Sequence, residues 1–182
     1  MLTVLVSVMP DAACSIILTG FMGAGKSSVG RVLSRLCGLP FIDLDAEIVA
    51  DAGQSINQIF AEKGEDYFRG EEQRILNLLL ARGPAVLATG GGAVLADENR
   101  RAMRSHGTIV NLQASLATVL SRLEGAKDRP LYAGHDPQAR IKALMAAREQ
   151  FYADADIRID TNGKSVEDVA AEIIDKLRKL PA

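Results

Sequence analysis

The sequence predicts an α/β fold in one domain, with a mostly parallel sheet of five strands and helices on both of its faces. Short apolar runs alternate with amphipathic stretches along the 182 residues, which is the pattern of strand–helix–strand units with right-handed crossovers. A glycine-rich loop joins the first apolar run to the first amphipathic stretch, in the strand–loop–helix order of a phosphate site. This length suits a single domain, residues 1–182, with a sizeable core.

Five apolar runs bounded by glycine, proline or polar residues are expected to form the strands. The expected strands are residues 15–19, 41–43, 85–89, 108–112 and 157–160. Ligands of such sheets gather at the carboxyl ends of the strands. In this chain those ends are at Gly20, Asp43, Gly90 and the start of the helix that follows Leu112.

The stretches between these runs carry the signals of helices. Apolar residues recur at helical spacing in 26–36. Ser55 and Gln58 form a capping box for a helix that Gly64 closes, and Asp97 is placed to cap another. The expected helices are residues 26–36, 46–52, 55–64, 65–82, 97–104, 115–123 and 137–152, with a last one opened by Ser165.

The segment GFMGAGKS, residues 20–27, fits the phosphate-loop pattern G-x-x-x-x-G-K-[ST]. Its three glycines permit turns in which successive N–H groups face one anion. Lys26 is expected to reach the outer phosphates of ATP or GTP, and the Ser27 hydroxyl to hold Mg²⁺. A glycine-rich connector is the alternative, whereas a dinucleotide fingerprint lacks its third glycine here. The expected phosphate contacts are Gly23, Ala24, Gly25, Lys26, Ser27 and Ser28.

Two carboxylates, Asp43 and Asp45, flank Leu44 at the end of the second strand. If the strand continues through them, both side chains face the same side. Such a pair suits two tasks, holding Mg²⁺ and accepting the proton of an attacking hydroxyl. The alternative is that one of them only caps the following helix. Because the third strand ends in ATGGG, with no acid at the Walker-B position, Asp43 is the nearest candidate metal ligand.

Two further segments are typical of a ligand site. Gly90, Gly91 and Gly92 follow the third strand and can present amides to a ligand, although a tight turn would also use glycine. Residues 124–136 show no periodicity, and an irregular loop of this length is usually functional in a compact domain. Arg129 in that loop is expected to act from a closing lid on the transferring phosphoryl group, a solvated charge being the alternative.

Composition excludes several classes of protein. Hydrophobic residues make up 48% and charged residues 24%, as in ordinary globular proteins, and the net charge of −2 gives no reason to expect a nucleic-acid partner. Two cysteines are too few for a disulfide framework and lack metal-ligand spacing. No apolar run approaches the roughly 20 residues of a membrane span, and the apolar start lacks a basic region. A cytoplasmic protein without a membrane partner is expected.

Several segments, taken together, resemble the shikimate kinase family over nearly the whole chain from about Ser15. In the family's order and spacing they are GFMGAGKSSVG, FIDLD, SINQIF with GEDYFRGEE, TGGGAV, DRPLYAG and DTN. The resemblance implies a three-layer α/β/α P-loop kinase with strand order 2-3-1-4-5, a substrate-binding subdomain at 44–72 and a lid at 124–136. It also implies transfer of the ATP γ-phosphoryl group to the 3-hydroxyl of shikimate, with Mg²⁺, in the pathway to chorismate and the aromatic amino acids.

The resemblance also implies a role for individual residues near the phosphates. Asp43 looks toward Mg²⁺ and Asp45 toward the substrate hydroxyl. Arg129 matches the lid arginine at the phosphates, and Arg122 matches an adenine-stacking position. Catalytic roles are implied for Asp45, Lys26 and Arg129.

A second implied set binds the acceptor substrate. On sequence alone, arginines placed like Arg69 and Arg148 on helices are more often solvated surface charges than site residues. By the resemblance they match the arginines that clamp the shikimate carboxylate, which suits bidentate guanidinium partners. The implied shikimate contacts are Asp45, Arg69, Gly90, Gly91, Gly92 and Arg148. Where relatives carry an arginine near the adenine, this chain has Gly163 and Lys164.

Three other readings stay open. Another small-metabolite kinase of the same fold, such as a gluconate kinase, is disfavoured by the DLD, the triple glycine and the paired arginines. A non-catalytic nucleotide-binding protein would be expected to lack Lys26, Asp45 or Arg129, and all three are present. A GTPase switch would need an N-K-x-D segment, which the chain lacks. A monomer is expected.

Overall fold

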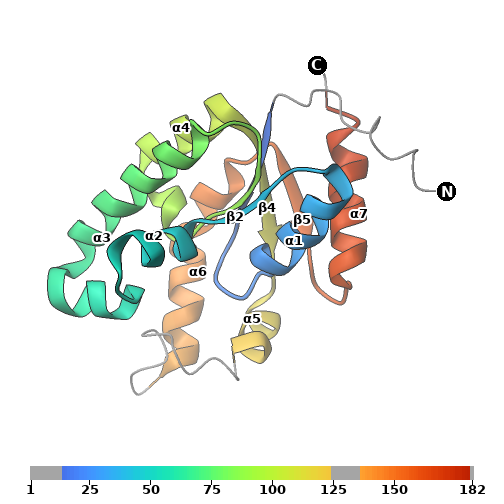
Figure 1. Cartoon of the computed structure of the whole chain (residues 1–182). Helices are drawn as coiled ribbons and strands as arrows, with labels where there is room; N and C mark the ends of the chain where they lie inside the picture. Colours follow the sequence, from blue (N-terminus) through green and yellow to red (C-terminus); the bar gives the residue numbers. More distant parts are fainter. Residues whose placement is uncertain (1–13, 124–135, 181–182) are drawn as a thin grey trace.

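A parallel five-stranded sheet lies at the centre of the computed structural model, which describes residues 14–123 and 136–180 (Figure 1). The sheet order is β2-β3-β1-β4-β5, and each neighbouring pair is parallel. The predicted sheet and its strand order are therefore confirmed. The strands are β1 (Ser15–Thr19), β2 (Phe41–Asp43), β3 (Val86–Ala88), β4 (Gly107–Gln113) and β5 (Ile157–Asp160).

Helices connect the strands in the predicted alternation. They are α1 (Lys26–Cys37), α2 (Leu44–Ala52), α3 (Ile56–Leu80), α4 (Asp97–His106), α5 (Leu116–Leu123), α6 (Pro137–Ala153) and α7 (Val166–Leu177). A short 3₁₀ helix, η1 (Ala93–Leu95), follows the triple glycine and has no counterpart in the sequence-based expectation. None of the helices in the described ranges is long and apolar enough for a membrane span.

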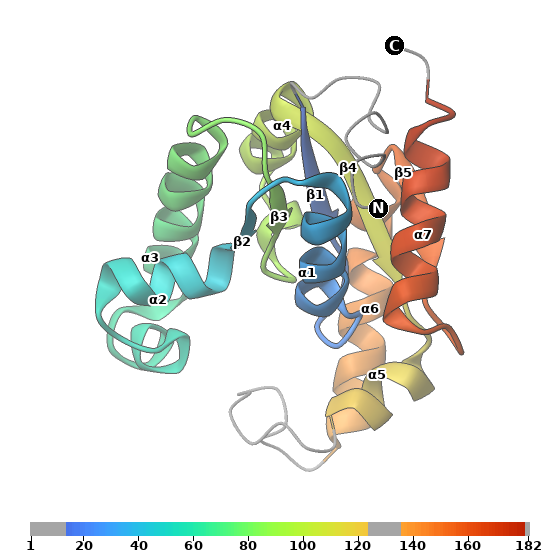
Figure 2. The same ribbon diagram turned by 45° about the vertical axis from the view of Figure 1, so that its right-hand side comes forward.

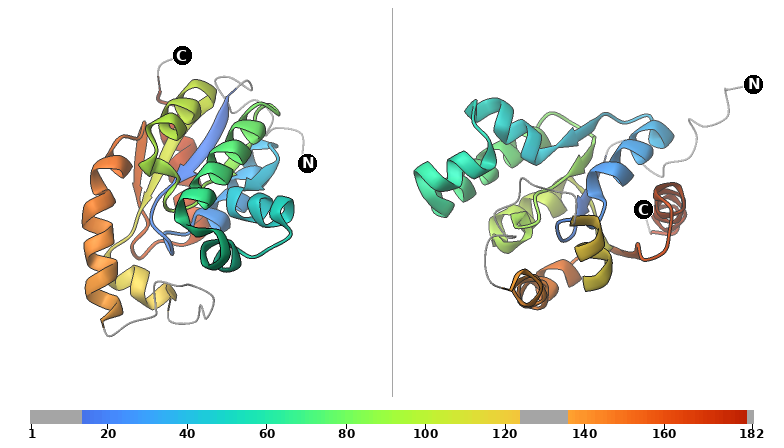
Figure 3. Two further views of the ribbon diagram at one scale, coloured as in Figure 1. Left: turned by 90° about the vertical axis from the view of Figure 1, so that its left-hand side faces the viewer. Right: turned by 90° about the horizontal axis from the view of Figure 1, so that it is seen from below.

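The side chains of β1 alternate between two hydrophobic cores, one on each face of the sheet. Ile17 packs into the core that includes residues of α2, α3, α4 and α6. Ile16 and Leu18 pack into the other core, which α1 and α7 cover. Each of these three side chains is at most 1% exposed. The sheet thus has helices on both faces, as the view from below in Figure 3 shows, and the three-layer prediction is confirmed.

Helix α2 and the first part of α3 extend away from the sheet at its β2 edge (Figure 2). The predicted capping box is present, because Ser55 Oγ accepts from Gln58 N at 3.3 Å and Gln58 Oε1 accepts from Ser55 N at 2.8 Å. Gly64, with φ 83° and ψ 175°, interrupts the helix without ending it. The two predicted helices around Gly64 therefore meet at a kink, and no loop separates them.

Two helix starts differ from the prediction. Asp97 lies in the first turn of α4 and does not cap it; Ala96 is at the cap position and gives no side-chain hydrogen bond. A carboxylate in the first turn still stabilises a helix through the macrodipole. Helix α2 begins at Leu44, directly after β2. The strand does not continue to Asp45, so the expected alternation of Asp43 and Asp45 along one strand is wrong.

Candidate active site

The glycine-rich loop adopts the predicted turns, which residues with a Cβ disfavour. Gly20, Gly23 and Gly25 have φ values of 140°, 78° and 99°, a region that residues with a Cβ rarely occupy. Gly20 also has no room for a side chain, since a Cβ there would lie 2.5 Å from the Leu112 carbonyl oxygen. Gly25 is the left-handed N-cap of α1, so the helix begins at Lys26 with its first amides at the loop. This arrangement forms an anion site.

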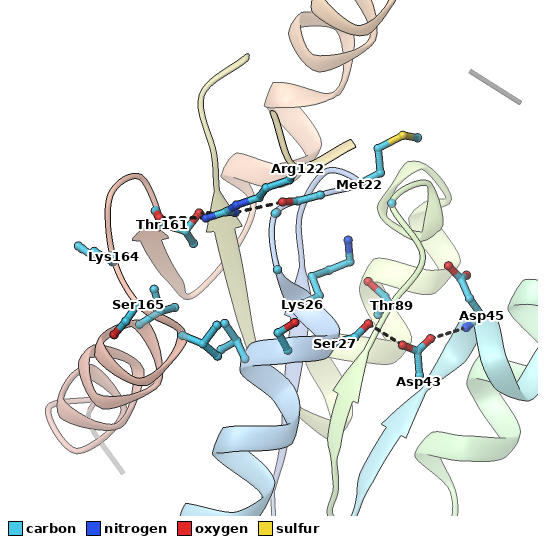
Figure 4. Close-up of a pocket in the computed structure, with 18 residues that line it drawn as sticks. Met22, Lys26, Ser27, Asp43, Asp45, Thr89, Arg122, Thr161, Lys164 and Ser165 are labelled. Atoms are coloured by element: carbon cyan, nitrogen blue, oxygen red, sulfur yellow. Dashed lines mark hydrogen bonds between the residues drawn. The ribbon is translucent and has the colours of Figure 1, made fainter. Parts of the chain in front are cut away.

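Lys26 extends from the start of α1 back over the loop (Figure 4). Its Nζ donates to the carbonyl oxygens of Gly20 at 2.8 Å and Phe21 at 3.1 Å. The ammonium is thereby held beside the loop amides, where an entering phosphate could exchange for these carbonyl partners.

Asp43 has two separate contacts, one for each carboxylate oxygen. Its Oδ2 accepts from Ser27 Oγ at 2.7 Å, next to the phosphate loop (Figure 4). Its Oδ1 accepts from the backbone N of Asp45 at 3.1 Å and of Ala46 at 3.4 Å, and so caps α2. The helix cap and the candidate metal ligand, which the sequence presented as alternatives, are combined in one side chain.

The oxygens of Ser27 and Asp43 fit a magnesium ion. Mg²⁺ prefers hard oxygen donors and is usually bound through one or two carboxylates together with substrate phosphates. Within the described residues, no three His, Cys, Asp or Glu side chains form a cluster that could hold a metal by themselves. A site completed by phosphate oxygens is therefore the arrangement that these two residues suit.

A cavity of about 440 Å³ opens around the phosphate loop. Ten of the predicted site residues line it: Gly23, Ala24, Gly25, Lys26, Ser27, Ser28, Asp43, Asp45, Gly91 and Arg122. Such a volume is typical of small-molecule sites. The remaining described ones, Arg69, Gly90, Gly92 and Arg148, are not among its lining residues, but Gly90 approaches Asp45, Gly92 approaches Arg69 and Arg148 reaches Gly91. Arg129 lies outside the described residues.

The triple glycine is required by close approach of charged groups. A Cβ on Gly90 would lie 2.8 Å from both Asp45 Oδ1 and Glu72 Oε1. A Cβ on Gly92 would lie 2.5 Å from Arg69 Nη2. Neither glycine has the positive φ that a left-handed turn would need. The segment thus brings its backbone against acidic and basic side chains, which a simple tight turn would not require.

Arg69 and Glu72 form an ion pair one helical turn apart on α3. Arg69 Nη1 donates to Glu72 Oε2 at 2.8 Å, and the other side of the guanidinium donates to Glu65 Oε1 at 3.1 Å. Glu72 is 1% exposed, and its Oε1 has no hydrogen-bond partner among the described residues. Burial raises the pKa of Glu72, an effect that the neighbouring Arg69 only partly offsets.

Sequence reasoning missed Glu72, although a signal was available. Phe68, Ile75, Leu76 and Leu79 form the buried stripe of α3, and Glu72 falls within that stripe at helical spacing. A carboxylate in an apolar stripe is unusual, because fully buried acids are almost always paired. That position could have marked Glu72 as a site residue.

Arg148 approaches the triple glycine from α6. Its Nη1 donates to the Gly91 carbonyl oxygen at 3.5 Å, and its guanidinium carbon lies 5.9 Å from the centre of the Phe21 ring. Its charge also lowers the pKa of Glu72, after the larger effects of burial and Arg69. The structure therefore brings the two arginines together around one loop, although they are far apart in the sequence.

Arg122 connects the phosphate loop to the segment after β5 (Figure 4). Its Nη1 donates to the Gly23 carbonyl oxygen at 3.0 Å and to Thr161 Oγ1 at 3.3 Å, while Nη2 donates to the Thr161 carbonyl oxygen at 3.3 Å. Thr161 is 2% exposed and belongs to the DTN segment, but it was not predicted as a site residue. Lys164, one of the departures from the family pattern, lines the same cavity and pairs with Glu172 at 2.6 Å.

Comparison with known proteins gives one consistent result. A sequence profile described as shikimate kinase matches residues 22–178. The chain is 52% identical to a shikimate kinase of Geobacter metallireducens over 164 residues, covering 90% of this chain and 92% of the relative. Its fold superposes with a TM-score of 0.88 on a shikimate kinase from Acinetobacter baumannii in complex with shikimate, at 37% identity and with 92% and 94% of the two chains covered.

A gluconokinase from Sinorhizobium meliloti is also similar, with a TM-score of 0.62 over 92% of this chain and 93% of that one. Its identity of 19% shows a shared fold and nothing more specific. The gluconate-kinase alternative is therefore not favoured.

Proposed function

This chain belongs to the shikimate kinase family, and we propose that it transfers the γ-phosphoryl group of ATP to the 3-hydroxyl of shikimate, giving shikimate 3-phosphate and ADP. One observation supports this most directly. Asp45 lies where the phosphate-loop cavity meets the triple glycine, and that loop is flanked by Arg69 and Arg148. The proposed positions of the phosphoryl donor, the proton acceptor and the carboxylate clamp thus follow one another in space along one site.

The acceptor side suits a small hydroxylated carboxylate. Two guanidinium groups can bind one carboxylate through directed, charge-assisted hydrogen bonds. Glu72 holds Arg69 from one side at 2.8 Å, which fixes the orientation of that guanidinium before substrate enters. The absence of side chains at Gly90 and Gly92 lets the acidic and basic groups of the site approach the backbone closely, because a Cβ at either position would collide with them.

On the donor side, the amides of the loop and Lys26 would stabilise negative charge on the β- and γ-phosphates. Asp45 would orient the 3-hydroxyl and accept its proton as the oxygen attacks the γ-phosphorus and ADP departs. Arg122 would pack against the adenine, and Arg129 would add a guanidinium at the phosphates, as the family resemblance implies. Ser27 and Asp43 would hold Mg²⁺, which when bound neutralises phosphate charge.

The decisive experiment compares Asp45→Asn with the unaltered chain in a coupled assay of ADP release. The unaltered chain should release ADP with shikimate, and far less with gluconate or a nucleoside monophosphate. Asp45→Asn should abolish the shikimate-dependent release while leaving ATP binding, measured by titration calorimetry, nearly intact. Asp66→Asn, an exposed aspartate of α3, is the matched control and should be fully active.

Two results would overturn the proposal. Absence of shikimate-dependent ADP release from the unaltered chain would remove the function and would leave a non-catalytic nucleotide-binding protein as the better reading. Retained turnover in Asp45→Asn would remove the role of that carboxylate. We further propose a cytoplasmic monomer without nucleic-acid or membrane partners, and light scattering on a sizing column tests the monomer.

A further inference from the structure

Tyr152, in the last turn of α6, contacts the triple glycine at Gly91. Its side chain is buried, and its hydroxyl donates to the Gly91 carbonyl oxygen at 2.6 Å. Burial raises the pKa of Tyr152 to about 12, so the phenol keeps its proton near neutral pH. Neither the sequence pattern nor the family resemblance drew attention to this residue.

The Gly91 carbonyl is a junction between the two halves of the site. A Cβ on Gly91 would lie 3.4 Å from Met22 N and 3.7 Å from the Gly20 carbonyl oxygen, so this residue packs directly against the phosphate loop. Because the peptide group is planar and trans, fixing the Gly91 C=O also fixes the direction of the Gly92 N–H, which points away from Tyr152. Gly92 in turn is the residue that approaches Arg69.

Arg148 and Tyr152 are four residues apart on α6, so they lie on one face of the helix. Both donate to the same carbonyl oxygen, but the bonds differ, at 3.5 Å for Arg148 Nη1 and 2.6 Å for the Tyr152 hydroxyl. The tyrosine therefore makes the short bond that satisfies Gly91. The guanidinium makes only a long bond to this oxygen and also interacts with the Tyr152 hydroxyl, since its charge and a hydrogen bond oppose part of the effect of burial on the pKa of Tyr152.

We propose that Tyr152 is a positioning residue for the acceptor substrate: its hydroxyl holds the Gly91–Gly92 peptide in place and prevents Arg148 from being captured by the Gly91 carbonyl. This inference rests on the proposed function, since it assigns Arg148 to the shikimate carboxylate. Without the hydroxyl, a half-buried carbonyl would lack its best donor. Arg148 would move toward that carbonyl, and its contact with substrate would weaken.

The test is Tyr152→Phe in the full chain, which keeps the ring and removes only the hydroxyl. The KM for shikimate should rise about tenfold, as for loss of one hydrogen bond to a charged group. The KM for ATP and kcat should stay within about twofold, because binding of the acceptor carboxylate is lost equally from the ground and transition states. Tyr67→Phe is the matched control, since Tyr67 is 43% exposed and, within the part of the chain that the structure describes, its hydroxyl accepts a hydrogen bond only from Lys63.

A double-mutant cycle with Arg148→Lys separates positioning from general support of the fold. If Tyr152 acts through Arg148, removing the hydroxyl in the Arg148→Lys background should change the shikimate KM by much less than tenfold. Assays are run below the melting transition of each variant. An unchanged shikimate KM in Tyr152→Phe, or equal changes in the shikimate and ATP KM values, would overturn the inference. Inactivity of the unaltered chain would instead overturn the proposed function.

Discussion

Replacement of Gly92 by alanine tests how the substrate side of the site is built. The backbone of Gly92, with φ −100° and ψ −7°, accepts alanine without strain. The new methyl group, however, would start 2.5 Å from Arg69 Nη2 and needs at least the 3.4 Å of ordinary contact. The end of the Arg69 side chain must therefore move by about 0.9 Å, which also disturbs its 2.8 Å bond to the buried Glu72.

The same displacement is large for a directed hydrogen bond. A charged hydrogen bond contributes about 1.5–3 kcal/mol, and 1.4 kcal/mol corresponds to a factor of about ten in affinity. Gly92→Ala should therefore raise the KM for shikimate between about tenfold and a hundredfold. The KM for ATP should be unchanged, while the midpoint of urea unfolding should fall, because the buried Glu72 carboxylate loses part of its pairing.

The control is Gly70→Ala, the residue next to Arg69 on the same helix. A Cβ at Gly70 meets nothing within 4 Å, so this variant should keep its shikimate KM. It should also gain about 0.5–1 kcal/mol in unfolding free energy, since alanine suits a helix interior better than glycine. If Gly92→Ala binds shikimate as well as Gly70→Ala does, Arg69 is not a substrate contact and the reasoning fails.

Two further substitutions separate roles that single residues combine. Asp43→Asn should keep the cap of α2, because asparagine caps as well as aspartate, so the unfolding free energy should change by no more than about 0.5 kcal/mol. The kcat/KM of this variant should nevertheless fall, and the variant should need a far higher Mg²⁺ concentration for half-maximal activity. An unaltered Mg²⁺ dependence would contradict the metal role. Glu72 has a raised pKa in the folded chain because of burial, so the folded state holds its proton more tightly than the unfolded state does. Its contribution to stability is therefore complete below its unfolded pKa and is lost as the pH rises through the folded pKa, at up to about 1.4 kcal/mol per pH unit. Urea unfolding over a pH series should show Glu72→Gln becoming more stable relative to the unaltered chain as the pH rises, and a difference that does not vary with pH would refute this assignment.

The order of elements could be predicted because each strand and helix carries its own local signal. Glycines with positive φ, the capping box at Ser55 and the apolar runs depend on nearby residues only, and the structure confirms them. The resemblance to shikimate kinase, confirmed by the comparisons, supplied the strand order. Where prediction failed, as at the start of α2, a side-chain cap from Asp43 outweighed the expected continuation of the strand.

The parts of the site that escaped prediction depend on contacts between distant segments. Glu72 forms an i, i+3 pair with Arg69, which on sequence alone resembles a solvated surface pair. Its place in the apolar stripe of α3 was a local signal, but the approach of Gly90 to its carboxylate depends on a distant segment. Tyr152 lies in the last turn of a helix whose apolar residues form no clear stripe, and its partner carbonyl lies 61 positions away. Contacts with such distant segments cannot be predicted from the residues that neighbour Glu72 or Tyr152 in the sequence.

The absence of any connecting residue between β2 and α2 has a mechanical consequence. Asp43 is both the last residue of the strand and the cap of the helix, and its carboxylate also contacts Ser27 of the phosphate loop. No flexible connecting segment can therefore absorb a rotation of α2 relative to the sheet. The helix would have to rotate about Asp43 itself, so any movement of the helices on the acceptor side would displace the carboxylate oxygen that contacts Ser27.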